Sequence, residues 1–322
     1  MINDMVFQLL RASLFSSNDP LSLPDWKPVF EEMKVQTVAA LPELWLKTNL
    51  PFAKPWLNYC AQKQGQWVRV MHGQDQLIHL LDDNNIPCVI IKGAAAAIAY
   101  PHPTLRSMGD VDVLVKRCDL DRAAEVMEEN GYLLTHDKDH VDHHYNYSKD
   151  KISFELHRKM AFIDEADENL LTLFEEGIDN RNYQTIGTYR FPSLPPLLNG
   201  LSLLFHINQH LRSGLGLRQI IDWMMYVNTL TDDQWEELLD LLKTVAMDRL
   251  ALTTTAMCQR YLGLRHIVDE DDLPVDDLMT HIMEKGNFGC KSGETGKIAS
   301  VFFDLTNPLR AFKRLQAGGL CR

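Results

Sequence analysis

The sequence predicts an α+β protein, in which a small mixed β-sheet with flanking helices lies between two helical regions. Three observations predict this class. Apolar residues recur at helical spacing up to about residue 85, short apolar runs typical of strands follow up to about residue 195, and helical spacing then returns. We therefore expect an N-terminal helical cap (1–85), a mixed α/β core (86–195) and a C-terminal helical domain (196–322).

The N-terminal cap is expected to consist of short helices. Helical spacing is clearest in WVRVMHGQDQLIHLL, at positions 67–81. Proline lacks the backbone N–H that a helix interior needs, so each proline of this region is expected to interrupt a helix. These prolines lie at positions 20, 24, 28, 51 and 55.

The central region alternates between strand-like and helical segments. A continuous apolar run over 88–91 predicts a buried strand, and DVDVLV at 110–115 predicts a second one. Between Asp119, a candidate N-cap, and Gly131, a stop signal, the spacing predicts a helix. Further strands are expected in YLLTH (132–136), HHYNYS (143–148) and ISFELHR (152–158), followed by a hairpin in YQTIGTYRF (183–191).

The C-terminal domain begins after a group of prolines at positions 192, 195 and 196. Two long amphipathic helices are expected, in LLNGLSLLFHINQHL (197–211) and LRQIIDWMMYVNTL (217–230). TDDQ at 231–234 has the spacing of a capping box and predicts the start of another helix.

Composition excludes several classes of protein. With 322 residues, of which 45% are hydrophobic, the chain is long and apolar enough to fold around a large core. A formal charge of -12 disfavours binding to bulk nucleic acid. The six cysteines are widely spaced, and no apolar run is long enough to cross a bilayer. We therefore expect a protein of the reducing cytoplasm, without a signal peptide or a membrane partner.

Three carboxylates are the strongest candidates for chemistry. In a strand over 110–115, alternation places Asp110 and Asp112 on one face and the valines on the other. In a strand over 152–158, Glu155 lies on the polar face and becomes the third carboxylate if the two strands are neighbours. Like charges that lie so close together favour a bound divalent cation, and oxygen donors without thiolates suit Mg²⁺ or Mn²⁺. Taken alone, a D-x-D pair is more often a solvated strand end.

A candidate phosphate site precedes these carboxylates. Lys92 and Gly93 lie where a predicted strand runs into an alanine-rich helix, and backbone N–H groups at such a turn can receive phosphate. Gly93 allows close approach of the backbone, and Lys92 adds a positive charge. Arg106 is a further candidate contact to phosphate. The alternatives are a plain strand-to-helix turn and an ion pair of Arg106 with a nearby acid.

These motifs together resemble the polymerase-β-like nucleotidyltransferase superfamily, and more closely a family of uncharacterised nucleotidyltransferases. The resemblance is carried by KGAA, the following YP-x-P-x₂-R, GDVDVLV and FELHR, and it extends more weakly into GLRQIIDWMMYV. It implies a catalytic core over 86–195 in which Asp110, Asp112 and Glu155 bind metal. It further implies that Lys92, Gly93, Arg106 and Arg218 contact the nucleotide. Lys92 stands where the broad superfamily usually has glycine.

The activity that the resemblance implies is Mg²⁺-dependent, two-metal-ion transfer of a nucleoside monophosphate from an NTP, such as ATP, to a hydroxyl or similar group. The acceptor is expected to be a small molecule or a protein. One alternative is a nucleotide-binding or regulatory protein of the same fold without turnover. Another is a zinc-dependent hydrolase that uses the histidine cluster of residues 136–144, comprising His136, His140, His143 and His144.

Two further residue pairs in the helical domain can be explained by structural roles alone. His206 and His210 are spaced for a shared helix face but lack the adjacent glutamate of metalloprotease motifs, so helix packing is the expected role. Arg218 and Asp222 have i, i+4 spacing, so the alternative to a nucleotide contact by Arg218 is a structural ion pair. The histidines at 143 and 144 are expected on opposite faces of a strand.

Overall fold

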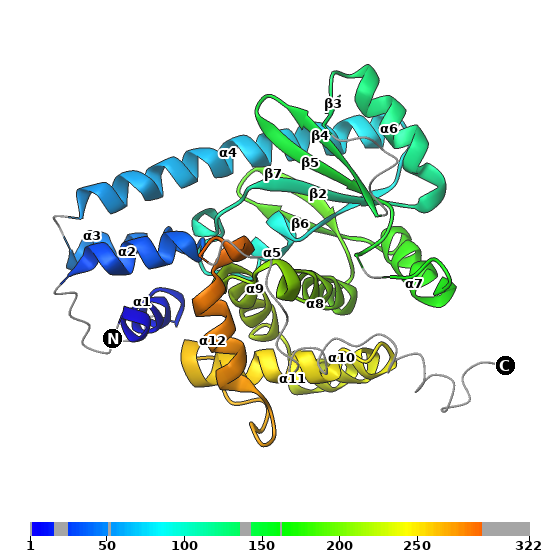
Figure 1. Cartoon of the computed structure of the whole chain (residues 1–322). Coiled ribbons are helices and arrows are strands. Elements are labelled where there is room, and N and C mark those ends of the chain that lie inside the picture. Colours follow the sequence, from blue (N-terminus) through cyan, green and yellow to red (C-terminus); the bar gives the residue numbers. More distant parts are fainter. Residues whose placement is uncertain (1, 16–24, 51–52, 136–142, 162, 292–322) are drawn as a thin grey trace. The chain divides into compact units, whose positions relative to one another are not determined.

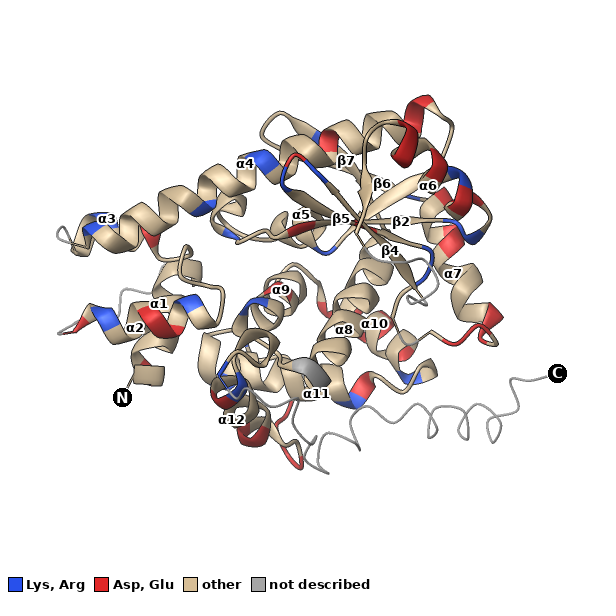
Figure 2. Ribbon diagram, turned by 45° about the horizontal axis from the view of Figure 1, so that its top comes forward, with Lys and Arg blue, Asp and Glu red and all other residues tan. Residues whose placement is uncertain are grey.

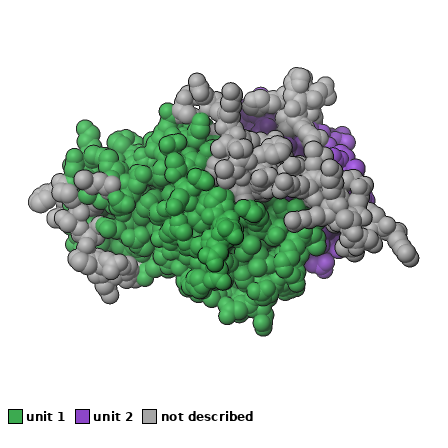
Figure 3. All heavy atoms as spheres, turned by 60° about the horizontal axis from the view of Figure 1, so that its bottom comes forward, with its two compact units in different colours: residues 1–58, 206–322 green, residues 59–205 purple. Residues whose placement is uncertain are grey.

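The computed structural model describes residues 2–15, 25–50, 53–135, 143–161 and 163–291. The chain forms two compact units (Figure 3). We call Tyr59–Phe205 the sheet unit, and Met1–Asn58 together with His206–Arg322 the helical unit. The division into three consecutive domains expected from the sequence stays a prediction.

The sheet unit contains a seven-stranded mixed sheet with the strand order β3-β4-β5-β2-β1-β7-β6 (Figure 1). Two of its pairings, β2 with β5 and β1 with β7, are parallel, and the others are antiparallel. The expected α+β class is therefore confirmed. The strands are β1 (Cys88–Ile91), β2 (Asp110–Val115), β3 (Leu133–Leu134), β4 (His144–Lys149), β5 (Ile152–His157), β6 (Asn182–Ile186) and β7 (Tyr189–Ser193).

Helices of the sheet unit cover the apolar sides of these strands. The core joins buried side chains of α4 and α6 with those of β1, β2 and β5. Val111, Val113 and Val115 all lie in this core, as their alternation predicted. Three helices lie wholly in the unit: α5 (Gly93–Ala97), α6 (Leu120–Glu129) and α7 (Glu168–Asp179). Two 3₁₀ turns accompany them, η1 (Pro103–Leu105) and η2 (Arg117–Asp119).

Two long helices pass from one unit into the other along the chain, α4 (Lys54–Asp83) and α8 (Pro196–Ser213). The 30 residues of α4 correct the expectation of short N-terminal helices. Its proline, Pro55, is the second helical residue, and Pro28 is the third residue of α2 (Trp26–Val35). Proline is tolerated in a first turn because those N–H groups have no partner within the helix.

The helical unit has a separate core of packed helices. Trp223 Nε1 donates a hydrogen bond to Thr255 Oγ1 inside it, at 2.9 Å. The capping box predicted at Thr231 and Gln234 is present at the start of α10. The remaining helices are α1 (Ile2–Phe15), α3 (Glu43–Asn49), α9 (Leu217–Val227), α10 (Asp232–Thr244), α11 (Asp248–Met257) and α12 (Val275–Lys285), with a π-helical turn η4 (Cys258–Leu262) and a 3₁₀ turn η5 (Asn287–Gly289).

The described residues contain neither a membrane-spanning helix nor a disulfide bond. Their helices include none that is both long and apolar enough to cross a membrane. Their five cysteines, at positions 60, 88, 118, 258 and 290, are all free.

Candidate functional site

The parallel pairing of β2 with β5 brings two predicted site residues together. Asp112 is the register partner of Glu155, so their side chains lie on the same face of adjacent strands. The neighbours Val113 and Leu156 point into the core and are fully buried. Asp112 is also almost fully buried, whereas the side chain of Glu155 keeps 25% of its accessible surface. Glu155 is therefore the more accessible of the two carboxylates.

Lys92 lies directly beside this carboxylate pair. Antiparallel pairing of β1 with β2 places Ile91 opposite Asp112, so the next residue ends up next to the carboxylate. The Lys92 Nζ donates to Asp112 Oδ1 at 2.8 Å and lies 4.0 Å from Glu155 Oε2. In this conformation, therefore, the lysine is paired with the aspartate.

His157 completes the buried cluster, and the sequence did not single it out. Its Nε2 lies 3.0 Å from Asp112 Oδ1 and 3.2 Å from Glu155 Oε2, so one ring nitrogen contacts both carboxylates. The signal available in the sequence was alternation, which put His157 on the same polar face as Glu155. What alternation cannot give is the distance to β2, which depends on the strand pairing.

Electrostatics within this cluster favour charged forms. Burial disfavours charge on every member, but opposite charges outweigh it. Attraction to Lys92 and hydrogen bonding to His157 hold the pKa of Asp112 well below its usual value. The pKa of Glu155 is lowered despite burial and the charge of Asp112, chiefly by His157. The carboxylates in turn raise the pKa values of Lys92 and His157 against the effect of burial.

Two more imidazoles adjoin His157. The ring centroid of His144 lies 4.9 Å from that of His157, and the ring centroid of His143 lies 4.4 Å from that of His144. The expected separation of His143 and His144 onto opposite faces is therefore wrong: His143 precedes β4 and escapes strand alternation. Burial, reinforced by the neighbouring histidines, lowers the pKa of each to about 4. His136 and His140 lie outside the described residues.

The lysine-glycine turn has an unusual backbone. Lys92 has φ 54° and ψ -137°, and Gly93 has φ 33°. A Cβ built on Gly93 would lie 4.0 Å from the carbonyl oxygen of Asp110, so the turn adjoins the start of β2. The helix that follows, α5, has only five residues, all but the first buried, so its dipole is small. Any phosphate contact here would depend on Lys92 and on backbone approach.

The remaining predicted site residues lie at the start of β2, just before it, and in the helical unit. Asp110 is half-buried at the first position of β2, opposite Ser153. The negative charge of Asp110 also helps to raise the pKa of Lys92. The Arg106 side chain is buried and donates to the carbonyl of Ser107 at 3.2 Å. Arg218 is the second residue of α9, in the helical unit, so its nucleotide contact stays a prediction.

The histidine pair of α8 also belongs to the helical unit. The Nε2 atoms of His206 and His210 lie 2.9 Å apart, so one ring donates a hydrogen bond to the other. Both side chains are buried. Among the described residues, the one group of three close metal-type ligands contains neither of them.

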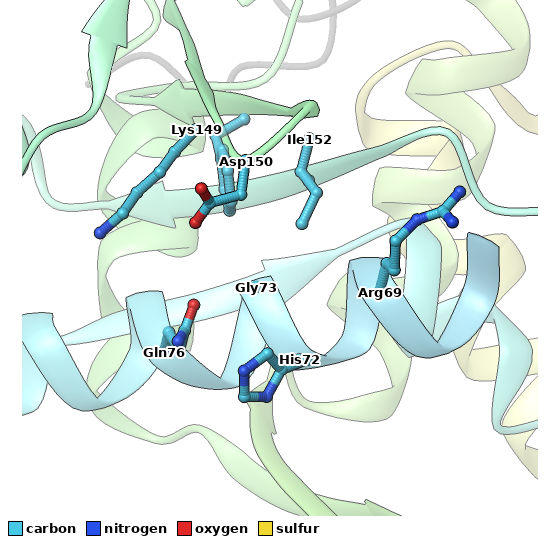
Figure 4. Close-up of a pocket in the computed structure, with 8 residues that line it drawn as sticks. Arg69, His72, Gly73, Gln76, Lys149, Asp150 and Ile152 are labelled. Atoms are coloured by element: carbon cyan, nitrogen blue, oxygen red, sulfur yellow. The ribbon is translucent and has the colours of Figure 1, made fainter. Parts of the chain in front are cut away.

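A cavity of about 160 Å³ lies elsewhere in the sheet unit. Figure 4 shows its lining, with His72, Gly73 and Gln76 on α4 and Asp150 in the turn between β4 and β5. Its strand residues, Ile152 and Phe154, alternate with Glu155 and therefore point to the opposite face of β5. This cavity is thus separate from the carboxylate cluster.

The carboxylate side chains suit a hard divalent cation in their chemistry. Asp110, Asp112 and Glu155 offer oxygen donors from one face of two adjacent strands, the ligand type that Mg²⁺ and Mn²⁺ prefer. The close group of metal-type ligands in the described part of the chain is a different one, formed by His144, Glu155 and His157. Its members' ligand atoms lie within 4.8 Å of one another, and it shares only Glu155 with the predicted trio.

Two solved structures are similar to part of this chain at low identity. None of the curated proteins compared matches this chain significantly. Among solved structures, the antibiotic-resistance factor ANT(2'')-Ia is similar at 15% identity with a TM-score of 0.39, over 61% of this chain and 96% of that one. An antigenic nucleotidyltransferase-like protein from Paracoccidioides brasiliensis is similar at 15% identity with a TM-score of 0.37, over 62% and 94%.

The decisive match is to a protein-family model described as uncharacterised nucleotidyltransferase. It covers residues 36–263, which include the whole sheet unit and the predicted carboxylates, lysine and glycine. The chain therefore belongs to this family of uncharacterised nucleotidyltransferases.

Proposed function

We propose that this protein transfers a nucleoside monophosphate from an NTP to a hydroxyl or similar acceptor, with release of pyrophosphate. The observation that carries the proposal is the in-register pair of Asp112 and Glu155 beside the Lys92 ammonium, at a turn that Gly93 allows. Neighbouring carboxylates with a flanking cation are what the binding of metal-bound phosphate requires.

In this proposal each side chain has a distinct role. Asp110, Asp112 and Glu155 would hold Mg²⁺ or Mn²⁺, which when bound supplies charge for the phosphates and lowers the pKa of the acceptor hydroxyl. Lys92 and Gly93 would position the polyphosphate, with Arg106 and Arg218 as auxiliary contacts. The acceptor oxygen attacks the α-phosphorus, the bond to the bridging oxygen breaks, and the pyrophosphate leaves. Glu155 and Asp112 are the candidate acceptors for the hydroxyl proton.

Charge argues for a small molecule or a protein as the acceptor. The chain carries a net charge of -12, and acidic residues are frequent on α6, at Asp121, Glu125, Glu128 and Glu129 (Figure 2). Such a surface repels a polyanion, so bulk nucleic acid is disfavoured. A cytoplasmic location stays a prediction from the dispersed cysteines.

The test is incubation of the protein with each labelled NTP, Mg²⁺ and a metabolite extract, followed by measurement of pyrophosphate and of nucleotidyl adducts by mass spectrometry. Glu155→Gln and Asp110→Asn are expected to lower transfer by at least about a hundredfold, since positioning and electrostatics supply most of the catalysis. Asp121→Asn, on the exposed side of α6, is the matched control. Full activity in both site variants contradicts the assignment.

Asp112→Asn is a poorer test than these two. It removes the charge partner of a buried lysine, and breaking a buried ion pair costs about 3–5 kcal/mol, so lost activity would be confounded by lost stability. The non-catalytic alternative predicts NTP binding without pyrophosphate release, so the same assay separates the two readings.

A further inference from the structure

We propose that His144, Glu155 and His157 form a binding site for a borderline divalent transition metal of the Zn²⁺ class. The site goes beyond the proposed transfer reaction and does not depend on it. It shares Glu155 with the predicted carboxylate trio but has two imidazole ligands in place of the aspartates.

The distances between the three ligand groups suit a single ion. His157 Nε2 lies 3.2 Å from Glu155 Oε2, and His144 Nε2 lies 3.9 Å from Glu155 Oε1. Bonds from Zn²⁺ to nitrogen or oxygen are about 2.0–2.2 Å long, so two ligand atoms of one ion lie about 3–4 Å apart. These two contacts involve different oxygens of Glu155, and one ligand atom from each of the three residues lies within 4.8 Å of the others. Rotation of the Glu155 carboxylate or of a histidine ring is therefore needed to bring all three atoms to the distances of one ion.

The donor set favours transition metals over Mg²⁺. Two imidazoles and one carboxylate are the ligands of catalytic zinc sites and of non-haem iron sites, whereas Mg²⁺ prefers oxygen donors and water. Both histidines turn Nε2 towards Glu155, so both can bind through the same atom. Register pairing of His144 with His157 across β4 and β5 holds the two rings side by side.

The surrounding charges are compatible with a bound divalent metal ion. Without metal, the Nε2 proton of His157 is shared between Asp112 and Glu155. A metal ion at His157 replaces that proton, which is released to solvent. Asp112 then keeps its bond from Lys92 at 2.8 Å, so no buried carboxylate is left without a counter-charge.

The experiment is a Co²⁺ titration of the full-length chain after removal of metal with a chelator. Cobalt held in the four- or five-coordinate geometry of a zinc-type site gives visible absorption bands much stronger than those of six-coordinate cobalt in water. We expect stoichiometric bands that Zn²⁺ abolishes by competition and that a large excess of Mg²⁺ leaves in place. Absence of such bands, or their loss on addition of Mg²⁺, overturns the proposal.

Variants identify the ligands. His144→Ala is expected to weaken Co²⁺ binding at least about tenfold, by analogy with the loss seen even for outer-shell partners of metal ligands. His143→Ala, which removes the adjacent ring, and Asp110→Asn, which removes a carboxylate of the trio alone, are the matched controls and should change affinity less than His144→Ala does, because neither residue supplies a ligand atom. If His144→Ala does not fold, Co²⁺ affinity is measured with His144→Gln instead.

Two outcomes contradict the assignment of ligands. Unchanged Co²⁺ binding in the His144 variants excludes that residue, and loss of binding in Asp110→Asn with retention in His144→Ala indicates a carboxylate site instead. Both outcomes are read from Co²⁺ binding and say nothing of Mg²⁺-dependent pyrophosphate release by the wild-type chain, so this proposal and the proposed function fail separately.

Discussion

Lys92 has a backbone conformation that L-residues rarely adopt, and its side chain explains why it is tolerated. At φ 54° and ψ -137° a non-glycine residue is strained by about 1–3 kcal/mol. The buried bond of Lys92 to Asp112 offsets this strain, because it pairs a carboxylate that would otherwise be buried with His157 alone. Strain retained beside clustered charges is typical of a functional site.

Backbone strain at Lys92 predicts the relative stability of two variants that both lose the ammonium group. Lys92→Gly relieves the backbone strain and Lys92→Ala keeps it, so the glycine variant should be more stable by about 1 kcal/mol or more. Where the backbone is unstrained, alanine is instead the more stable choice by about 0.4–1 kcal/mol. Urea unfolding of both variants gives the sign of the difference in stability. A more stable alanine variant would show that the backbone at Lys92 is not strained.

His143 predicts how stability depends on pH. Burial lowers its pKa in the folded state from 6.5 to about 4, so below pH 6.5 the unfolded state binds the proton more readily. The free energy of unfolding therefore falls as the pH drops from about 6.5 towards 4. His143→Asn should lose less stability than the wild type between pH 7 and pH 5, by about 1–2 kcal/mol, in urea unfolding with EDTA. Equal losses would mean that His143 titrates normally.

Strand alternation made part of the site predictable from the sequence. Strand alternation needs only local information, so the common faces of Asp110 with Asp112 and of Glu155 with His157 were readable in advance. Which charges meet across strands depends on register, which no local pattern specifies. The pairing of Lys92 with Asp112 and the two contacts of His157 therefore required the structure.

At the scale of elements, the packing of α4 on the sheet depends on a glycine. A Cβ at Gly73 would lie 2.6 Å from Ile152 Cδ1 and 3.2 Å from Phe154 Cζ. Without a side chain, the helix comes within contact distance of β5, the strand that carries Glu155 on its other face. Gly73 thus supports the site indirectly, because it sets how closely helix and strand approach.

Two glycines of the same helix give a matched comparison. Gly65→Ala has no atom within 4 Å of the new methyl group and should stabilise the protein by about 0.5–1 kcal/mol through helix propensity. Gly73→Ala gains the same propensity but must displace Ile152 and Phe154, so it should be less favourable by about 1–2 kcal/mol. Thermal unfolding of both variants measures the difference in stability. Equal effects would show that the side chains of β5 move away from the new methyl group at no cost in stability.

Strands were easier to predict than helix lengths. The segments 88–91 and 110–115 coincide with β1 and β2, because apolar runs bounded by proline and glycine have few alternatives. The length of α4 was missed because Pro55 was treated as a break, although a first-turn proline starts a helix as well as it ends one. Asp119 precedes α6 as expected but makes no side-chain cap, since a 3₁₀ turn leads directly into the helix.

At the scale of the whole molecule, the core predicted from the sequence and the sheet unit of the structure have different boundaries. The sequence placed a core at 86–195, whereas the sheet unit spans Tyr59–Phe205. The difference includes most of α4, whose buried side chains form one wall of the core around the sheet. They are Trp67, Val70, Met71, Leu77, Ile78 and Leu81.

Removal of that wall should prevent folding. Loss of a single large buried side chain costs about 2–5 kcal/mol, and a domain has about 5–15 kcal/mol in total, so six such losses, about 12–30 kcal/mol, remove most or all of the available stability. A fragment of residues 59–205 is therefore expected to unfold cooperatively and to give dispersed amide resonances, and a fragment of residues 86–195 to do neither. Cooperative folding of the shorter fragment would favour the three-part division, and failure of both would show that the sheet unit needs the helical unit to fold.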